Sequence, residues 1–403
     1  MQVITAPSPP SPQSPKQSYR WQVYVLIAAG CLTTMTGGVV SPVLPEMVQE
    51  LSLSPQWAGT LVSIHALAIA LFTPLFGLLA DRIGKRTVLL PALLLYALFG
   101  VAGAWMNTLP LLLMVRVLLG MSSAAIAAAS IGLLSTIFEG AERSRMLGYA
   151  TSAMTIASIM IPIVGGWIGA TEWRYAFYLY GFGLPTAILA ILMIREPQKR
   201  SGGLIDLDQN DLLFTTLRRP STLMLYGTIA AAAAIVYTVV IYTPLYLKDI
   251  IDAGPALNGS VLGIRAIGAA LMSAFAASRL ARRFGTQRTI ATGFITMAFT
   301  LLTIPLLNQL QWIVPAAVLF GMGFGITIPN IYDLLAGLAP EEVRATVLAV
   351  GTGANSLGQF LSPLLLGPIW NGLGLTSVFY SAGAIALLIG LRIALRPLYR
   401  LSA

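Results

Sequence analysis

The sequence predicts an all-α integral membrane protein whose twelve transmembrane helices form two related halves of six. Three observations lead to this fold class. Of the 403 residues, 57% are apolar and only 10% are charged, whereas about a quarter of the residues in a soluble domain are charged. The apolar residues come in runs of about 20 or more, long enough to cross a hydrocarbon layer. Sequence features also recur at an offset of 200 to 201 residues.

Hydropathy along the chain defines the individual spans, with ends placed to within a few residues. We predict them at residues 22–44, 57–80, 87–106, 109–134, 146–171, 175–194, 222–248, 257–280, 288–307, 310–336, 345–371 and 374–396. The longest polar stretch separates the sixth and seventh spans and carries both acidic and basic residues, so we interpret it as a linker. The chain then divides into a disordered cytoplasmic tail (1–20), an N-terminal six-helix bundle (21–194), a cytoplasmic linker (195–220), a C-terminal six-helix bundle (221–396) and a cytoplasmic tail (397–403).

The distribution of positive charge predicts the orientation in the membrane. Lys and Arg residues near span ends are retained in the cytoplasm. With the N-terminus inside, 20 of the 24 Lys and Arg residues fall on the cytoplasmic side, only Arg174 and Lys248 lie outside, and Arg116 and Arg265 lie within spans. The first 20 residues are rich in Pro and Ser and lack the apolar segment of a signal peptide. We therefore expect a multi-pass protein of the bacterial inner membrane with both termini in the cytoplasm.

Composition also excludes several classes of protein. The net charge of +9 could suggest nucleic acid, but the basic residues are scattered between apolar runs and form no basic face. Cys31 is the only cysteine, so neither a disulfide nor a cysteine metal site is expected. An integral-membrane enzyme would need paired acids, a metal cluster or a nucleophile with a base at one depth, and the spans hold one His and no carboxylate pair. We expect no enzyme activity, no cofactor and no metal.

The repeat indicates two homologous halves. Matching positions extend over four successive spans: Pro55 and Pro255, Gly59 and Gly259, His65 and Arg265, Gly84 and Gly285, Gly120 and Gly321, Arg143 and Arg344, Pro162 and Pro363, and Gly166 and Gly367. Each match means little alone, but together they keep nearly one offset.

The loop between the second and third spans carries a distinctive pattern. Its glycines permit a tight reversal, and an acid beside three bases can make charge-assisted contacts at the water interface. The alternative is an ordinary positively charged cytoplasmic loop. The residues of the pattern are Gly77, Asp81, Arg82, Gly84, Lys85 and Arg86. This sequence resembles the GxLaDrxGrkxxl signature of the major facilitator superfamily.

That resemblance implies the major facilitator fold, in which two six-helix bundles surround a central cavity. It also implies that the loop acid is a conformational latch near the start of the eleventh span. Asp81 would then hold the outward-facing state by meeting the N–H groups at the start of the helix after Glu341 and Glu342, where an anion is favoured. The second half has Arg282 in place of Asp81, so only one half keeps the latch.

Two further stretches resemble signatures of the same superfamily. In the fourth span, Arg116 precedes small residues, as in the second signature. In the fifth span, Pro162, Gly165 and Gly166 resemble the end of the gxxxGPxxGG signature of proton-coupled drug exporters, although its first two glycines are replaced. These positions have counterparts in the eleventh span at Pro363 and Gly367. Helix packing alone is the alternative explanation for such glycines.

Ionisable residues inside the membrane are costly and usually functional. His65, Arg116 and Arg265 all lie roughly 10 to 12 Å from the external surface at 1.5 Å per residue. We predict that they take part in substrate binding or coupling; the alternatives are an Arg bonded to backbone carbonyls and a His satisfied by packing. Many drug exporters of the family carry an acid in the first span, whereas here Glu46 lies only at its outer end. Two fixed positive charges favour an anionic or zwitterionic substrate.

Polar residues at membrane depth could complete the cavity, although hydrogen bonding between helices would explain them equally well. These further candidates for the site are Tyr237, Tyr242, Asn330, Tyr332, Asn355 and Gln359.

The function predicted from these features is secondary active transport by alternating access, most simply proton-coupled export of a small amphipathic organic compound by a monomer in the lipid bilayer. The alternative is an organic-anion or metabolite carrier, including a chelator or siderophore carrier, that works as an importer or uniporter. A lipid-binding or sensor protein is a third hypothesis. For proton coupling, His65 is the preferred group because Arg stays charged while His titrates near neutral pH; Asp81 and Asp333 are its competitors.

Overall fold

The computed structural model describes residues 16–138, 140–194 and 207–396, and every regular element in these ranges is helical. The first half contains α1 (Lys16–Gly38), η1 (Ser41–Val43), α2 (Leu44–Glu50), α3 (Pro55–Ile83), α4 (Lys85–Ala102), η2 (Gly103–Trp105), α5 (Leu109–Ile137), α6 (Gly140–Ile168), α7 (Trp173–Phe177), η3 (Tyr178–Phe182) and α8 (Gly183–Met193). The second half contains α9 (Leu207–Arg218), α10 (Pro220–Ile251), α11 (Pro255–Phe275), α12 (Ala277–Phe284), α13 (Thr286–Thr303), η4 (Ile304–Leu306), α14 (Leu310–Leu338), α15 (Arg344–Leu373) and α16 (Leu375–Leu395).

The predicted spans correspond to these helices. In the described part of the chain, eleven helical segments are long and apolar enough to cross a membrane. The remaining predicted span, 345–371, forms the 30-residue helix α15, which is less apolar because Gly, Ser, Asn and Gln interrupt it. The predicted class, an all-α membrane protein of twelve spans, is confirmed.

Two predicted segments differ in detail from the structure. Helix α1 begins at Lys16, so the last five residues of the segment 1–20, predicted as a disordered tail, continue the first transmembrane helix. The linker 195–220 contains α9, a helix of 12 residues. The rest of the N-terminal tail, linker residues 195–206 and the C-terminal tail 397–403 lie outside the described residues.

Proline and glycine set several helix boundaries. Pro55, Pro220 and Pro255 stand at the first position of α3, α10 and α11, where the missing N–H costs nothing and φ is already helical. Gly84 and Gly285 end α3 and α12 with φ of 106° and 88°, a conformation that side-chain-bearing residues rarely adopt. These two glycines occupy equivalent positions in the two halves, and their shared backbone conformation agrees with the sequence repeat.

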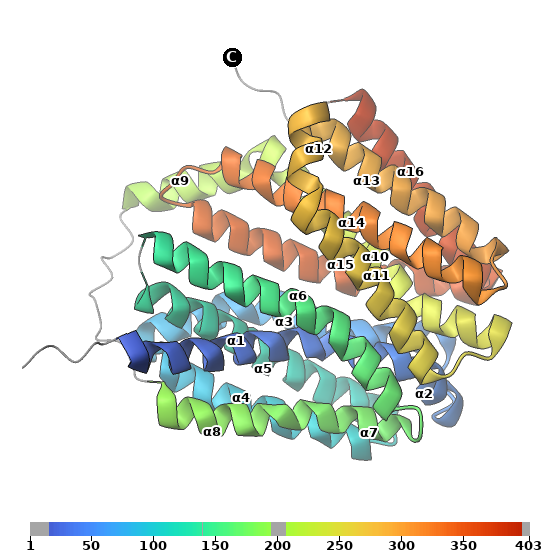
Figure 1. Cartoon of the computed structure of the whole chain (residues 1–403), viewed down its shortest axis with the longest axis horizontal. Helices are drawn as coiled ribbons and strands as arrows, with labels where there is room; N and C mark the ends of the chain where they lie inside the picture. Colours follow the sequence, from blue (N-terminus) through green and yellow to red (C-terminus); the bar gives the residue numbers. More distant parts are fainter. Residues whose placement is uncertain (1–15, 139, 195–206, 397–403) are drawn as a thin grey trace, which may run out of the picture.

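The helices form two bundles that contact each other through two related pairs of helices. Within the first half, α3 packs on α5, and α1 packs on α5 and α6; within the second, α11 packs on α14, α13 on α16, and α10 on α15. Between the halves, α3 packs on α15 and α6 packs on α11. In Figure 1 the first half (blue to green) lies below the second (yellow to red), and the halves separate toward the end where α9 lies.

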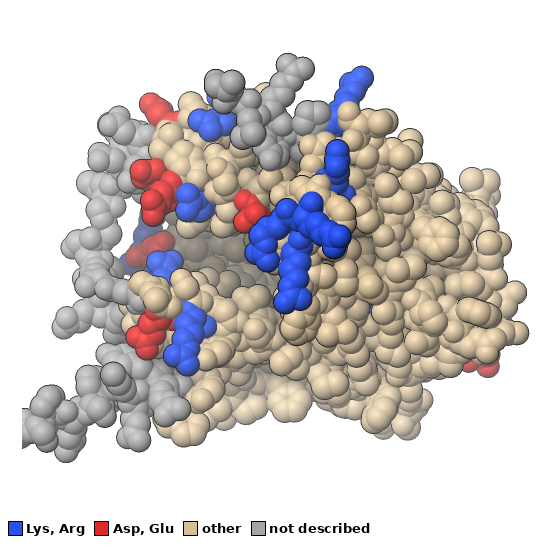
Figure 2. Space-filling view, turned by 45° about the horizontal axis from the view of Figure 1, so that its top comes forward, with Lys and Arg blue, Asp and Glu red and all other residues tan. Residues whose placement is uncertain are grey.

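The bundles are closed at one end and open at the other. At the end that carries α2, the Ser41 hydroxyl donates to the Val240 carbonyl of the opposite half, and the Asn258 amide donates to the Pro42 carbonyl at 3.4 Å. Figure 2 shows a hollow between the halves at the other end, which is the predicted cytoplasmic end. The structure is therefore an inward-open arrangement, given the predicted topology.

Candidate functional site

Arg116 on α5 is at the centre of a polar network inside the first bundle. Its side chain is 1% exposed. The guanidinium donates hydrogen bonds to the carbonyls of Thr36 (2.7 Å), Val62 (2.9 Å) and Leu61 (3.2 Å), to the Tyr180 hydroxyl (3.1 Å) and to Nδ1 of His65 (3.1 Å). Such bonds offset the cost of placing a charge in a region of low dielectric. In this conformation Arg116 joins α1, α3, α5 and η3, which matches the alternative of an Arg bonded to backbone carbonyls.

His65 on α3 is held in a defined protonation state by this network. A guanidinium has no acceptor, so Nδ1 of His65 accepts the bond from Arg116. The imidazole is then neutral, with its hydrogen on Nε2. The side chain is 2% exposed, which leaves little water to stabilise a charged ring.

The second half reaches this network through Tyr237 on α10. A Cβ on Gly37 of α1 would stand 2.6 Å from the Tyr237 hydroxyl and 3.2 Å from the His65 ring. The missing side chain at Gly37 therefore makes room for groups from both halves.

Arg265 on α11 occupies a different environment from Arg116. It lines a small, almost entirely apolar cavity inside the second bundle, together with Val239, Thr243 and Phe320. Its Nε is buried without a hydrogen-bond partner among the described residues, and so is Oγ1 of Thr243. The structure thus brings His65, Arg116 and Tyr237 together, with Arg265 nearby but unpartnered.

Three of the other predicted polar residues, Tyr242, Asn355 and Gln359, lie on α10 and α15. The Tyr242 ring packs edge-on against Trp370, and its hydroxyl is buried without a partner among the described residues. On α15 the Gln359 amide donates to the Asn355 side chain at 2.7 Å, and both residues are partly exposed.

Asn330 and Tyr332 lie near the predicted cytoplasmic end of α14. Asn330 donates to the Ile326 carbonyl (2.7 Å) and to the Ala277 carbonyl (3.4 Å), as expected for a residue that joins helices. It lies ten residues beyond Phe320, or about 15 Å along the helix. The structure does not bring it together with Arg265.

The predicted latch is disengaged in this conformation. The Asp81 side chain, in the last turn of α3, is 69% exposed and forms an ion pair of 3.6 Å with Lys85, the first residue of α4. Arg86 donates instead to the Ile191 carbonyl at 3.1 Å, and Gly77 has open space around its Cα. An open cytoplasmic end without an engaged Asp81 agrees with a latch that belongs to the outward-facing state.

We expect Asp81→Asn to reduce transport by roughly 2- to 10-fold, the loss that corresponds to one charge at a helix N-terminus. Membrane insertion should be unchanged, because the residue lies at an interface and not in a core. Transport by proteoliposomes containing equal amounts of folded protein measures this effect. Asp211→Asn, which changes an exposed acid on α9, is the matched control; wild-type transport by Asp81→Asn would remove the latch role.

The glycine motif of α6 lies at the closed end of the molecule. A Cβ on Gly166 would meet the backbone of Pro255 and Gly259 on α11, and a Cβ on Gly259 would meet the carbonyl of Pro162. Gly165 faces the backbone that follows α1, where its Cβ would be 3.2 Å from the Val39 carbonyl oxygen. These glycines therefore bring α6 into backbone contact with both halves.

The counterparts of this motif on α15 lie in the other contact between the halves. A Cβ on Gly59 of α3 would collide with Pro363, and Gly367 is buried on the same helix as Pro363. The closed end is thus sealed by two pairs of helices whose small residues occupy related positions.

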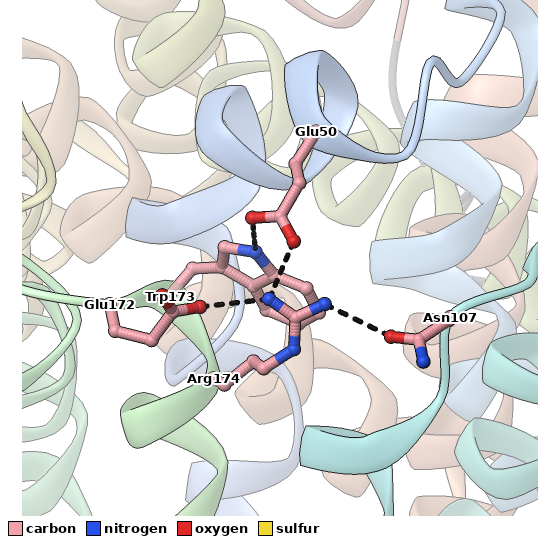
Figure 3. A network of polar contacts seen from close by, with 5 residues as sticks. All are labelled: Glu50, Asn107, Glu172, Trp173 and Arg174. Carbon is pink, nitrogen blue, oxygen red and sulfur yellow. Dashed lines mark hydrogen bonds and ion pairs between the residues drawn. The ribbon is translucent and has the colours of Figure 1, made fainter.

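A polar cluster that the sequence reasoning missed lies at the same end (Figure 3). Arg174 donates to Glu50 (2.6 Å), Glu172 (2.9 Å) and Asn107 (3.0 Å). The Trp173 indole donates to Glu50 at 2.6 Å and lies under the guanidinium. The cluster ties α2, the loop before α5 and α7 together within the first half. Its signal in the sequence was that Arg174 is one of two basic residues predicted outside.

The two bundles are sealed at one end and hollow at the other, and the first bundle contains a buried ionisable network. These features define a polytopic membrane transporter. The family model described as Major Facilitator Superfamily matches residues 26–363 and, in a second alignment, residues 250–401. The chain therefore belongs to the Major Facilitator Superfamily.

Relatives and solved structures agree with this assignment. The chain is 23% identical over 351 residues to the quinolone resistance protein NorA of Staphylococcus aureus, covering 87% of this chain and 90% of that protein. It is 23% identical over 358 residues to the class B tetracycline resistance protein of Escherichia coli, covering 85% and 88%. Its fold resembles the inward-facing, unoccupied bacterial homolog of the human lysosomal transporter Spinster, with a TM-score of 0.78, 16% identity and coverage of 95% and 96%. The D-xylose-proton symporter gives a TM-score of 0.76, 16% identity and coverage of 94% and 97%.

Proposed function

We propose that this protein is a proton-coupled exporter of a small amphipathic organic compound, working by alternating access across the bacterial inner membrane. The observation that carries the proposal is the hollow between the bundles, which opens at the predicted cytoplasmic end and is sealed at the other. Exporters and importers both pass through such a state, so the hollow supports alternating access, and export rests on the relatives. Resemblance to two drug-resistance proteins supports this direction. In this proposal the protein acts as a monomer, has both termini in the cytoplasm and uses the proton gradient without a cofactor.

Everted and right-side-out membrane vesicles test the direction of transport. With a quinolone and a tetracycline as probes, we expect accumulation in everted vesicles with an acidic interior and its collapse when the pH gradient is dissipated. Vesicles from the same membranes without the protein serve as the control for membrane leakage. Accumulation only in right-side-out vesicles would favour the alternative of an importer, and accumulation that ignores the pH gradient would favour a uniporter.

His65 is the coupling group in this proposal. Its Nδ1 lone pair already accepts the bond from Arg116 at 3.1 Å. A proton on Nδ1 would remove this acceptor and place a second positive charge beside the guanidinium. Protonation therefore opens the contact between His65 and Arg116. Because Tyr237 of the other half meets the same place at Gly37, this change acts on the contact between the bundles.

We expect His65→Gln to abolish gradient-driven accumulation in proteoliposomes while leaving exchange of labelled for unlabelled substrate intact. The Gln side-chain oxygen can still accept a hydrogen bond from Arg116, but it does not titrate. The measurements are accumulation across an imposed pH gradient, its pH profile, and counterflow without a gradient. Asp333→Asn is the comparison, since Asp333 is exposed on α14. If His65→Gln and His65→Ala both keep wild-type accumulation and pH profile, His65 is not the coupling residue.

A further inference from the structure

The two arginines inside the membrane differ in one decisive respect. Arg116 makes five hydrogen bonds to its own bundle. Arg265 takes part in none of the ion pairs within the described ranges, and its Nε is buried with no acceptor there. Arg265 is only partly buried, and no hydrogen bond among the described residues occupies its guanidinium. The guanidinium is therefore available to a group that the protein itself does not supply.

The surroundings of Arg265 favour an anion. The cavity beside it also contains the unpartnered hydroxyl of Thr243, which can donate a second hydrogen bond. The remaining lining is almost entirely apolar, which excludes water and strengthens the attraction between opposite charges.

The mouth of the hollow has the charge that an anion would require. Helix α12 carries Arg279, Arg282 and Arg283, and Arg282 stands where the first half has Asp81. Figure 2 shows a group of basic side chains on one side of the hollow and interspersed acidic and basic side chains on the other. A basic group beside the hollow raises the local concentration of anions and steers them toward it.

We propose that Arg265 binds the anionic group of the transported compound and that Thr243 donates a second hydrogen bond to it, so the substrate is an amphipathic organic anion such as an aryl carboxylate. The inference rests on the proposed function, because it assigns the substrate class of that transporter. A planar guanidinium fork matches the two oxygens of a carboxylate.

Ligand binding to the purified full-length protein tests the inference without requiring transport. The probes are a panel of aryl carboxylates, each paired with its neutral primary amide, and sodium chloride as an inorganic anion. Thermal stabilisation rises with ligand concentration relative to Kd, so it ranks the pairs. We expect the wild type to bind carboxylates roughly 10- to 100-fold more tightly than the amides, the range for a hydrogen-bonded charge.

The variants separate binding from folding. Arg265→Gln should abolish the preference for carboxylates, Arg265→Lys should keep part of it, and Thr243→Val should reduce it in a site that still carries its cation. Arg282→Gln, at the rim, should leave the preference at equilibrium unchanged. If Arg265→Gln does not fold, Arg265→Lys and Thr243→Val carry the test.

Three results would overturn the inference: equal affinity of the wild type for carboxylates and amides, an undiminished preference in Arg265→Gln, or chloride alone stabilising the protein as well as the carboxylates do. Proton-driven accumulation in everted vesicles together with any of these would leave the proposed function standing. If the protein prefers carboxylates but drives no accumulation in everted vesicles, the proposed function is overturned and the anion site at Arg265 still stands.

Discussion

Arg116→Met is expected to destabilise the folded protein by about 3–5 kcal/mol, the range for removing one member of a buried, hydrogen-bonded charge network. The reason is the set of acceptors left behind. Three backbone carbonyls, the Tyr180 hydroxyl and Nδ1 of His65 all lose a charged donor. Hydrogen bonds to a charged group are worth about 1.5–3 kcal/mol each, and Nδ1 of His65 keeps no other donor among the described residues. Thermal unfolding of the protein in detergent measures the change.

Two comparisons make this result specific. Arg116→Lys should be intermediate, because an ammonium group cannot span the acceptors that a guanidinium fork reaches. Arg145→Met is the matched control, since Arg145 is exposed and its guanidinium bonds to the Tyr149 hydroxyl on the same helix; it should leave the melting temperature close to that of the wild type. If Arg116→Met melts like the wild type, the network is not structural and Arg116 returns to the substrate and coupling candidates.

The sequence was most informative where one residue type and its spacing determine a local structure. Runs of apolar residues predicted the spans, and Gly84 and Gly285 predicted the turns at which α3 and α12 end with positive φ. The repeat predicted that the halves are related, and the structure pairs α3 with α15 and α6 with α11 accordingly. The sequence also predicted the less apolar span 345–371, which forms α15, because the segment is long enough to cross a membrane and follows the repeat.

The sequence could not distinguish Arg116 from Arg265. Both lie at a similar predicted depth in the membrane, and the position of a residue within its span predicts depth but not which groups surround it. The difference arises from tertiary packing, because α1, α3 and η3 present acceptors to Arg116, whereas apolar side chains of α10 and α14 surround Arg265. Gly37 illustrates the same limit, since its importance lies in a missing side chain that admits Tyr237 and His65. A single sequence does not predict which residues of other helices will pack against a given glycine.

Gly259→Leu is expected to abolish transport by preventing closure of the predicted external end. A Cβ at this position meets the Pro162 carbonyl and the Gly166 Cα, both backbone atoms that cannot move aside as a flexible side chain can. In the inward-open state α6 and α11 must approach this closely, so the substitution raises the free energy of that state. A penalty of about 1.4 kcal/mol already shifts the equilibrium tenfold toward the outward-facing state, and backbone overlap should cost more.

A reporter cysteine makes the shift measurable apart from transport. In a Cys31→Ser background, Ser41→Cys places a thiol at a position that is 0% exposed and contacts the opposite half at Val240. A membrane-impermeant maleimide added outside should label it at least about tenfold faster in Gly259→Leu than in the unsubstituted background, in proportion to the opened population. Gly148→Leu is the matched control, because a Cβ there meets open space on α6. Protection of the thiol together with normal transport in Gly259→Leu would show that contact between α6 and α11 does not seal the external end, and that closure depends on α3 and α15.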